Sequence, residues 1–159
     1  LQPYALERGV KIAIENLIDF QGVRFDKVPI NKARDNRQLL QRIFNHYPPE
    51  FIGLCFDSGH SNLGYDRMDQ LENFLDRLIV LHLNSNDGSY DQHHNLFVDN
   101  INWERLASLI AASVYSKPMS LEVVSSELDA NDEAFLQTAF ETGNRFAELV
   151  AAKKEVKMR

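Results

Sequence analysis

The feature that most constrains the fold of this chain is a set of four short, nearly continuous apolar segments spread along its 159 residues. Apolar runs without polar alternation are typical of parallel strands covered on both faces. A helical pattern, with apolar residues three and four apart, follows each run. The order β-α-β-α-β-α-β-α predicts an α/β fold with a parallel sheet. The predicted strands are Val10–Glu15, Phe51–Asp57, Leu78–Leu83 and Met119–Val124, and the predicted helices are Asn36–Tyr47, Asp66–Arg77, Trp103–Tyr115 and Asn131–Ala152.

The length and composition indicate one folded domain over residues 1–159. Hydrophobic residues make up 44% and charged residues 25%, which excludes a wholly disordered or collagen-like chain. No apolar run reaches the ~18 residues of a membrane span, so we predict no membrane association. The single cysteine, Cys55, cannot form an intrachain disulfide, which favours a cytoplasmic location. The formal net charge of −6 makes DNA binding unlikely, because phosphate affinity depends on clustered Lys and Arg.

At or near the end of each predicted strand is a side chain that can bind a metal ion: Glu15, Asp57, His82 and Glu122. A carboxylate at the end of a buried strand is costly unless it is paired or bound to a cation. Taken singly, each side chain could equally cap a helix or be a hydrogen-bonded core residue. Parallel strands lie ~4.8 Å apart, so four adjacent strand ends place their side chains around one point. Two Glu, one Asp and one His suit Mn²⁺, Mg²⁺, Co²⁺ or Zn²⁺.

Three further residues extend this set of candidate ligands. His60 comes three residues after Asp57, and Asp91 and His93 lie two apart in the segment after the third strand. An extended segment would point Asp91 and His93 to the same side, as an additional metal or substrate site requires. The alternative is a polar, solvated turn, since the preceding Asn86-Asp-Gly-Ser is itself strong turn chemistry.

The strings GVKIAIEN, IGLCFDSGH, VLHLNSNDGSYDQHH and SLEVV resemble the xylose isomerase-like TIM-barrel superfamily. That superfamily includes sugar and sugar-phosphate isomerases and epimerases, and also the endonuclease IV-type enzymes. The resemblance implies that the four strand-end residues bind the shared divalent metal. It also implies that His60 binds a substrate oxygen in the isomerases or a further zinc in the endonucleases. Asp91 and His93 would correspond to the Asp-x-His pair that binds the third metal of the endonucleases.

The predicted strands account for only part of such a barrel. A full (β/α)₈ barrel takes ~250 residues, and the four strands here resemble the last four, which predicts the C-terminal half. The start at Leu1, without a methionine, agrees with missing upstream residues. Half a barrel exposes two sheet edges, which are prone to aggregation. We therefore expect a homodimer, or association with a missing N-terminal half, that closes the barrel.

The first functional hypothesis is a divalent-metal-dependent isomerase or epimerase of a small sugar or sugar phosphate. A metal would polarise a carbonyl and its neighbouring hydroxyl and stabilise the enediolate formed on proton removal. By the resemblance to the epimerases, Glu15 and Glu122 would exchange protons with opposite faces of the substrate. The alternative is that both are only ligands and that a water or an absent residue is the base.

Two other hypotheses remain. One is an endonuclease IV-type zinc phosphodiesterase acting on apurinic DNA, which draws on His60, Asp91 and His93. The acidic charge opposes it, as does the segment Asn95-Leu-Phe-Val, which replaces the Pro-Gly turn usual in that branch. The other is an inactive fragment that needs its N-terminal half.

Overall fold

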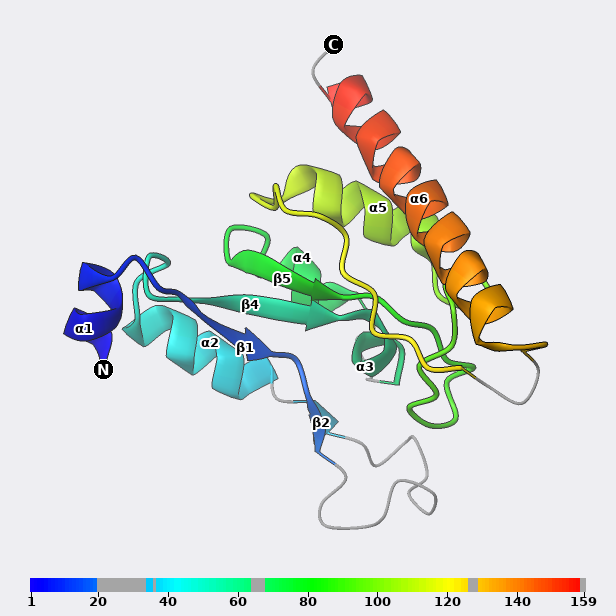
Figure 1. Cartoon of the computed structure of the whole chain (residues 1–159). Coiled ribbons are helices and arrows are strands. Elements are labelled where there is room, and N and C mark those ends of the chain that lie inside the picture. The colour runs from blue at the N-terminus through cyan, green and yellow to red at the C-terminus, as the bar shows by residue number, and fades with distance from the viewer. Residues whose placement is uncertain (20–33, 36, 64–67, 126–128, 158–159) are drawn as a thin grey trace.

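A three-stranded parallel sheet forms the centre of the computed structural model, which describes residues 1–19, 34–35, 37–63, 68–125 and 129–157 (Figure 1). The strand order is β1-β4-β5, with β1 at Ile12–Glu15, β4 at Ile52–Asp57 and β5 at Leu78–His82. These strands confirm three of the four predicted from apolar runs. They also confirm the α/β class with parallel pairing.

The register of the sheet aligns the carboxyl ends of the strands. β1 pairs with β4 up to Glu15 opposite Cys55, and β4 pairs with β5 up to Asp57 opposite His82. The last residue of each strand therefore lies at one edge of the sheet. This edge is where parallel α/β proteins bring functional side chains together.

The fourth predicted strand, Met119–Val124, is much shorter than predicted. It meets the sheet through one parallel bridge, in which the Leu83 N–H donates to the Ser120 carbonyl (2.9 Å) and the Glu122 N–H to the Leu83 carbonyl (3.0 Å). The Val124 N–H bonds instead to the carbonyl of His93 (2.9 Å). Within the described residues this segment has a sheet neighbour on one side only. Its pairing with the chain after β5 stops at that one bridge and does not extend into a regular strand.

Three of the four predicted helices are present, with small differences at their ends. They are α2 at Arg37–His46, α5 at Trp103–Ala112 and α6 at Asp132–Lys157. The Asn102 side chain caps α5 by accepting from the Arg105 N–H (3.0 Å). None of the helices in the part of the chain that the structure describes is both long and apolar enough to cross a membrane.

The fourth predicted helix, Asp66–Arg77, is wrong in extent. It is reduced to α4 at Asp69–Glu72, and residues 64–67 lie outside the described part. Beyond α4, the N–H groups of Phe74 and Arg77 bond three residues back, at 3.0 and 2.9 Å, rather than four. The chain therefore continues as tight turns that lead directly into β5.

Four short elements were not predicted: α1 at Gln2–Glu7, α3 at Ser58–Leu63, and the antiparallel pair β2 (Ile18–Asp19) and β3 (Arg34–Asp35). Of these, α3 is important for the site because it starts directly after β4. A helix that begins without a connecting loop holds its first turn close to the strand end.

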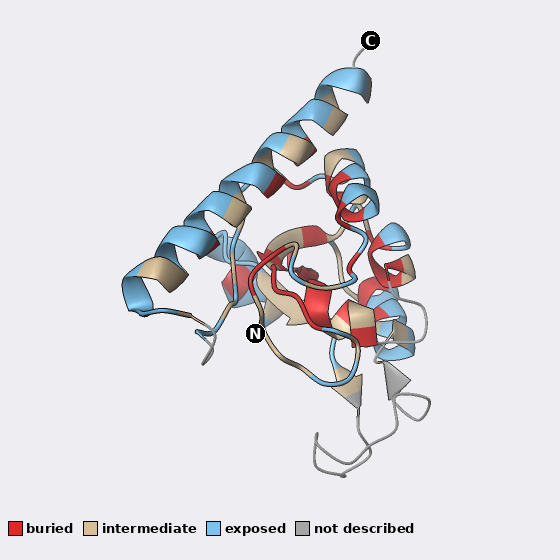
Figure 2. Cartoon of the chain, turned by 90° about the vertical axis from the view of Figure 1, so that its right-hand side faces the viewer, coloured by how far each residue is buried: buried red, intermediate tan, exposed pale blue. Residues whose placement is uncertain are grey.

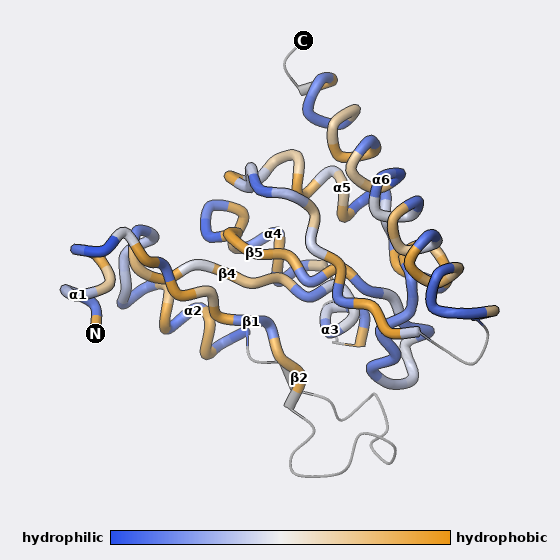
Figure 3. Tube along the Cα trace, viewed as in Figure 1, coloured by the Kyte–Doolittle hydropathy of each residue, from blue (hydrophilic) through white to orange (hydrophobic). Residues whose placement is uncertain are grey.

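The helices pack along the sheet and against each other. Figure 2, which looks towards the strand ends, shows several helices in a row on one side of the strands and a largely exposed α6 beyond them. Trp103 of α5 meets Phe146 of α6 edge to face, with ring centroids 5.3 Å apart. The strands and α6 also differ in hydropathy: in Figure 3 the central strands are mostly hydrophobic, whereas hydrophobic and hydrophilic residues are mixed along α6. The completely buried core includes Leu40, Leu54, Phe56, Leu71, Leu81, Leu83, Leu106, Ile110 and Phe146.

Candidate metal centre

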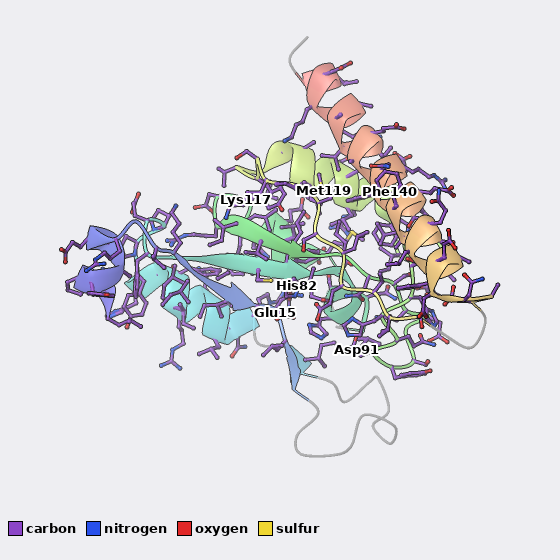
Figure 4. All side chains as sticks on the ribbon, in the orientation of Figure 1. Glu15, His82, Asp91, Lys117, Met119 and Phe140 are labelled. Carbon is purple, nitrogen blue, oxygen red and sulfur yellow. The ribbon has the colours of Figure 1, made fainter. Side chains whose placement is uncertain are left out.

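The four strand-end side chains predicted to meet do meet in the structure. Each of Glu15, Asp57, His82 and Glu122 offers one potential ligand atom, and these atoms all lie within 4.8 Å of one another. Figure 4 shows Glu15 and His82 side by side at the edge of the sheet. We call this group the four-residue cluster. The aligned register of β1, β4 and β5, together with the Leu83–Leu121 bridge, brings the four side chains together.

The ring of His82 faces two carboxylates of the cluster. Its Nδ1 lies 2.8 Å from Glu122 Oε2 and 3.7 Å from Glu15 Oε1. This nitrogen is buried, yet none of its neighbours satisfies it with hydrogen-bond geometry. A buried nitrogen that lies close to two carboxylate oxygens, without a hydrogen bond of good geometry to either, fits a bound divalent cation.

Asp57 is the most deeply buried member of the four-residue cluster, with no exposed surface. Its Oδ1 accepts from the His60 N–H (2.7 Å) and its Oδ2 from the Asn84 side chain (2.8 Å). Burial raises the pKa of Asp57 to about 6, although the positive charge and N–H of His60 oppose this. A buried anion of this kind is stabilised by a cation, so the donor set fits Mn²⁺, Mg²⁺, Co²⁺ or Zn²⁺.

His60 lies between Glu15 and Asp91. Its Nδ1 is 3.0 Å from the Asn16 carbonyl and 3.1 Å from Glu15 Oε1, and its Nε2 is 3.3 Å from Asp91 Oδ2. Burial alone lowers the pKa of His60, but hydrogen bonds to Asp91 and Glu15 and the charge of Asp57 outweigh burial and raise it to about 11. As a protonated ring, His60 donates hydrogen bonds and must lose a proton before it can bind a metal.

Asp91 and His93 lie beside the four-residue cluster (Figure 4 labels Asp91). His93 Nε2 is 3.0 Å from Asp91 Oδ2, and its Nδ1 is 2.8 Å from the Glu122 carbonyl. The backbone of His93 has a φ of 53°, in the left-handed region that non-glycine residues seldom occupy. His93 therefore holds the backbone at Glu122, and its role as a further ligand stays a prediction.

The trio His60, Asp91 and His93 does not form a second cluster as tight as the first. Among the described residues, the other group with this spacing consists of Glu15, Cys55 and His82. The thiol of Cys55 is buried, and burial together with the charge of Glu15 raises its pKa to about 12. A neutral buried thiol packs as a small apolar group.

Two buried asparagines at the site were given no role by the sequence reasoning, although Asn84 lies in the polar segment that it singled out after the third strand. Asn16 Nδ2 donates to the Asp57 carbonyl (3.0 Å) and Asn16 Oδ1 accepts from the Asp57 N–H (2.6 Å). Asn84 contacts the Asp57 carboxylate from the other side. Their closeness in sequence to predicted ligands could have indicated this role, because Asn16 directly follows Glu15 and Asn84 comes two residues after His82.

Comparisons with known proteins agree with this arrangement. The profile of the family described as "Xylose isomerase-like TIM barrel" matches residues 1–148. The chain belongs to this family. A parallel sheet with helices and the cluster at the carboxyl ends of its strands are what a partial α/β barrel presents.

Two curated relatives are similar to the chain in sequence, and both are described as uncharacterized. The chain is 29% identical over 156 residues to the uncharacterized protein y4fM of Sinorhizobium fredii, covering 98% of this chain and 47% of that protein. It is 25% identical over 155 residues to the uncharacterized protein MJ1311 of Methanocaldococcus jannaschii, covering 96% and 49%. The chain thus spans about half the length of these curated relatives.

A solved structure shows the same fold. The crystal structure of a D-tagatose 3-epimerase-like protein superposes with a TM-score of 0.63 and 23% sequence identity. The match covers 95% of this chain and 52% of the other. The fold of the chain therefore corresponds to about half of that protein.

Proposed function

We propose that this protein is a divalent-metal-dependent isomerase or epimerase of a small sugar or sugar phosphate. The observation that carries the proposal is the convergence of Glu15, Asp57, His82 and Glu122 within 4.8 Å. Family membership and the fold shared with a D-tagatose 3-epimerase-like protein support the same reaction class.

The four-residue cluster would hold the cation. When bound, Mn²⁺, Mg²⁺, Co²⁺ or Zn²⁺ supplies a Lewis acid that polarises a carbonyl and its neighbouring hydroxyl. Asp57, fully buried and hydrogen-bonded on both oxygens, would be the most rigid ligand. The side chain of Glu122, 46% exposed, would be the most accessible one.

Glu15 and Glu122 are the groups we assign to proton transfer. They come from the two outer members of the row of strand ends, with the ends of β4 and β5 between them. One carboxylate would take the proton from the carbon that bears the hydroxyl and adjoins the carbonyl, as the electron pair moves towards the carbonyl oxygen. Return of a proton to the other face of the same carbon gives the epimer. Return of a proton to the former carbonyl carbon, with transfer of the hydroxyl proton to the other oxygen, gives the isomer. His60 would bind a substrate oxygen by exchanging its contact with Asp91 for one with the substrate.

Solvent deuterium exchange tests these roles. We expect wild type to incorporate deuterium from D₂O into D-tagatose or its phosphates in the presence of Mn²⁺, and Glu15→Gln and Glu122→Gln to lose this exchange by about 100-fold or more. Glu50→Gln, an exposed change at the opposite end of β4, is the matched control and should exchange normally. Undiminished exchange in both active-site variants would remove the two glutamates as acid and base.

We infer that further (β/α) units close the barrel in the active form, either an N-terminal half or a second copy of this chain. Within the described residues, β1 pairs with β4 alone, and Val10, Leu17 and Val124 are about half exposed or more. The shared length with relatives supports this, because about half of each relative lies outside the match. Analytical ultracentrifugation tests it: a folded, stable monomer with full activity would contradict it.

We also propose a cytoplasmic location, which the buried, free thiol of Cys55 supports.

A second candidate function is an endonuclease IV-type zinc phosphodiesterase. It is favoured by the position of His60, Asp91 and His93 next to the cluster, and by Asp91 Oδ1, a buried oxygen without a hydrogen-bond partner. The net charge of −6 opposes DNA binding. Elemental analysis distinguishes the two functions: one bound ion per chain supports the isomerase, and three support the phosphodiesterase.

A further inference from the structure

Asn84 is a completely buried side chain that touches the metal centre without belonging to the four-residue cluster. We propose that Asn84 is a positioning residue, whose side-chain amide holds the Asp57 carboxylate in the orientation that presents it to the cation. This inference rests on the proposed function only in taking Asp57 as a ligand.

The hydrogen bonds of Asp57 show what the amide does. Asn84 Nδ2 donates to Asp57 Oδ2 at 2.8 Å, and the His60 N–H donates to Asp57 Oδ1 at 2.7 Å. Each carboxylate oxygen therefore has one donor within the protein and keeps further acceptor capacity for a cation. Rotation of the carboxylate would break both bonds in a fully buried place, which costs about 1–3 kcal/mol for each group left unpaired.

Asn84 is itself tied to the residue that follows Asp57. The Ser58 hydroxyl donates to the Asn84 carbonyl (2.6 Å) and accepts from the Asn84 N–H (2.9 Å). Ser58 is only 1% exposed and begins α3 directly after β4. The backbone at Asn84 is therefore anchored to the same strand end whose carboxylate its side chain contacts.

Gly59 leaves the space that the amide of Asn84 occupies. A Cβ at Gly59 would lie 2.0 Å from Asn84 Oδ1, so the oxygen occupies space that only a glycine leaves open. A flipped amide would bring its oxygen against Asp57 Oδ2, where two acceptors repel each other. The NH₂ group is thus directed at the carboxylate.

Two other asparagines near the site, Asn16 and Asn86, make different hydrogen bonds. Asn16 bonds to the backbone N–H and carbonyl of Asp57, so it holds the strand end rather than the carboxylate. Asn86 is equally buried, but its amide donates to the Gly59 carbonyl (2.9 Å). Asn86 is therefore a matched control: the same residue type, in the same segment, without a bond to the ligand.

Calorimetric titration of the full chain with Mn²⁺ and with Co²⁺ tests the proposal. We expect Asn84→Ala to bind about 10- to 100-fold more weakly than wild type, as is usual when the residue behind a ligand is removed. The visible spectrum of the Co²⁺ form should change as well, because the geometry around the ion is altered. Asn86→Ala should bind within about threefold of wild type and keep the wild-type Co²⁺ spectrum.

Circular dichroism identifies a variant that has lost its fold. If Asn84→Ala is unfolded, Ser58→Ala decides, because it leaves the amide in place and loosens only its anchor; we expect a smaller loss of affinity in the same direction. Suppose that folded Asn84→Ala binds the ions with wild-type affinity and keeps the Co²⁺ spectrum. That result would overturn the role of Asn84 but not the proposed function. The same result for Ser58→Ala has this meaning if Asn84→Ala does not fold. Failure of the wild-type chain to bind either ion would overturn both the inference and the proposed function.

Discussion

The two ends of the metal centre are built very differently. The end of β4 lies between β1 and β5, all six of its residues are buried, and Asp57 has protein donors on both carboxylate oxygens. The segment Met119–Val124 has one bridge to the sheet, and the side chain of Glu122 is 46% exposed. The comparison teaches that the candidate centre has one buried wall, which we call the rigid wall because its carboxylate is held by two donors, and one accessible wall. We therefore expect a cation to be held mainly by the first wall and a substrate to enter from the second.

The largest expected difference between these regions is in stability. Leu54→Ala removes a completely buried side chain from β4 and should lower the free energy of unfolding by about 2–5 kcal/mol. Leu121→Ala, in the bridged segment, removes a partly buried side chain and should cost about 1 kcal/mol. Urea unfolding followed by circular dichroism measures both. Equal losses would show that the two walls are packed alike.

Cation affinity should differ in the same direction. Asp57→Asn keeps the shape of the side chain but removes the buried charge, and we expect Mn²⁺ to bind about 100-fold more weakly. Glu122→Gln changes a half-exposed ligand, for which water can substitute, and should cost about tenfold. Calorimetric titration with Mn²⁺ compares them. A larger loss for Glu122→Gln would reverse the assignment of the rigid wall.

A pair of glycines allows a finer comparison. At Gly59 an added Cβ would meet Asn84 Oδ1 at 2.0 Å and Asn86 Nδ2 at 2.9 Å, so Gly59→Ala should cost about 1–3 kcal/mol of stability. At Gly143 of α6 the nearest atom is Leu121 Cδ1 at 3.0 Å, the end of a flexible side chain. There the gain in helix propensity, up to ~1 kcal/mol, should roughly cancel the crowding. Thermal unfolding of both variants checks this, and a clear loss for Gly143→Ala would mean that the bridged segment is more rigid than we describe.

The pH dependence should report the rigid wall. The pKa of Asp57 is raised to about 6 by burial, and a cation binds only its ionised form. Mn²⁺ affinity should therefore fall by at least about tenfold per pH unit below pH 6. In the cation-free chain the sign is opposite: the folded state keeps a proton that the unfolded state has released, so the contribution of Asp57 to stability is lost as the pH rises from about 4 to 6. An affinity that stays flat between pH 5 and 7 would contradict the first expectation.

The parts of the fold that were predictable are those determined by local pattern. β1, β4 and β5 are short apolar runs, and their parallel pairing follows from that pattern, although of the three β4 alone is buried at every residue. The segment Met119–Val124 has the same pattern, but its regularity depends on a neighbour on its second side, which no local signal reveals. The helix predicted at Asp66–Arg77 failed because the chain tightens into turns before β5.

The candidate site likewise has residues that the local sequence pattern predicts and residues that it does not. Glu15, Asp57, His82 and Glu122 were predictable because each lies at or near the end of a predicted strand and parallel strands align their ends. The supporting role of Asn84 was not, because an asparagine in a polar segment is typical of a turn. Only the contact of Asn84 with Asp57, made across 27 residues of sequence, distinguishes the two interpretations.

The bond between the Asn16 side chain and both backbone groups of Asp57 has a consequence for how β1 ends. A side chain here takes the place of one more rung of the β1–β4 ladder, so the main chain can leave the sheet at residue 16 without stranding a polar group. The backbone groups of Asp57 therefore stay hydrogen-bonded whichever way the main chain turns after Asn16. The end of β1 is thus finished by a side chain, which separates the path of the following segment from the position of the Asp57 backbone.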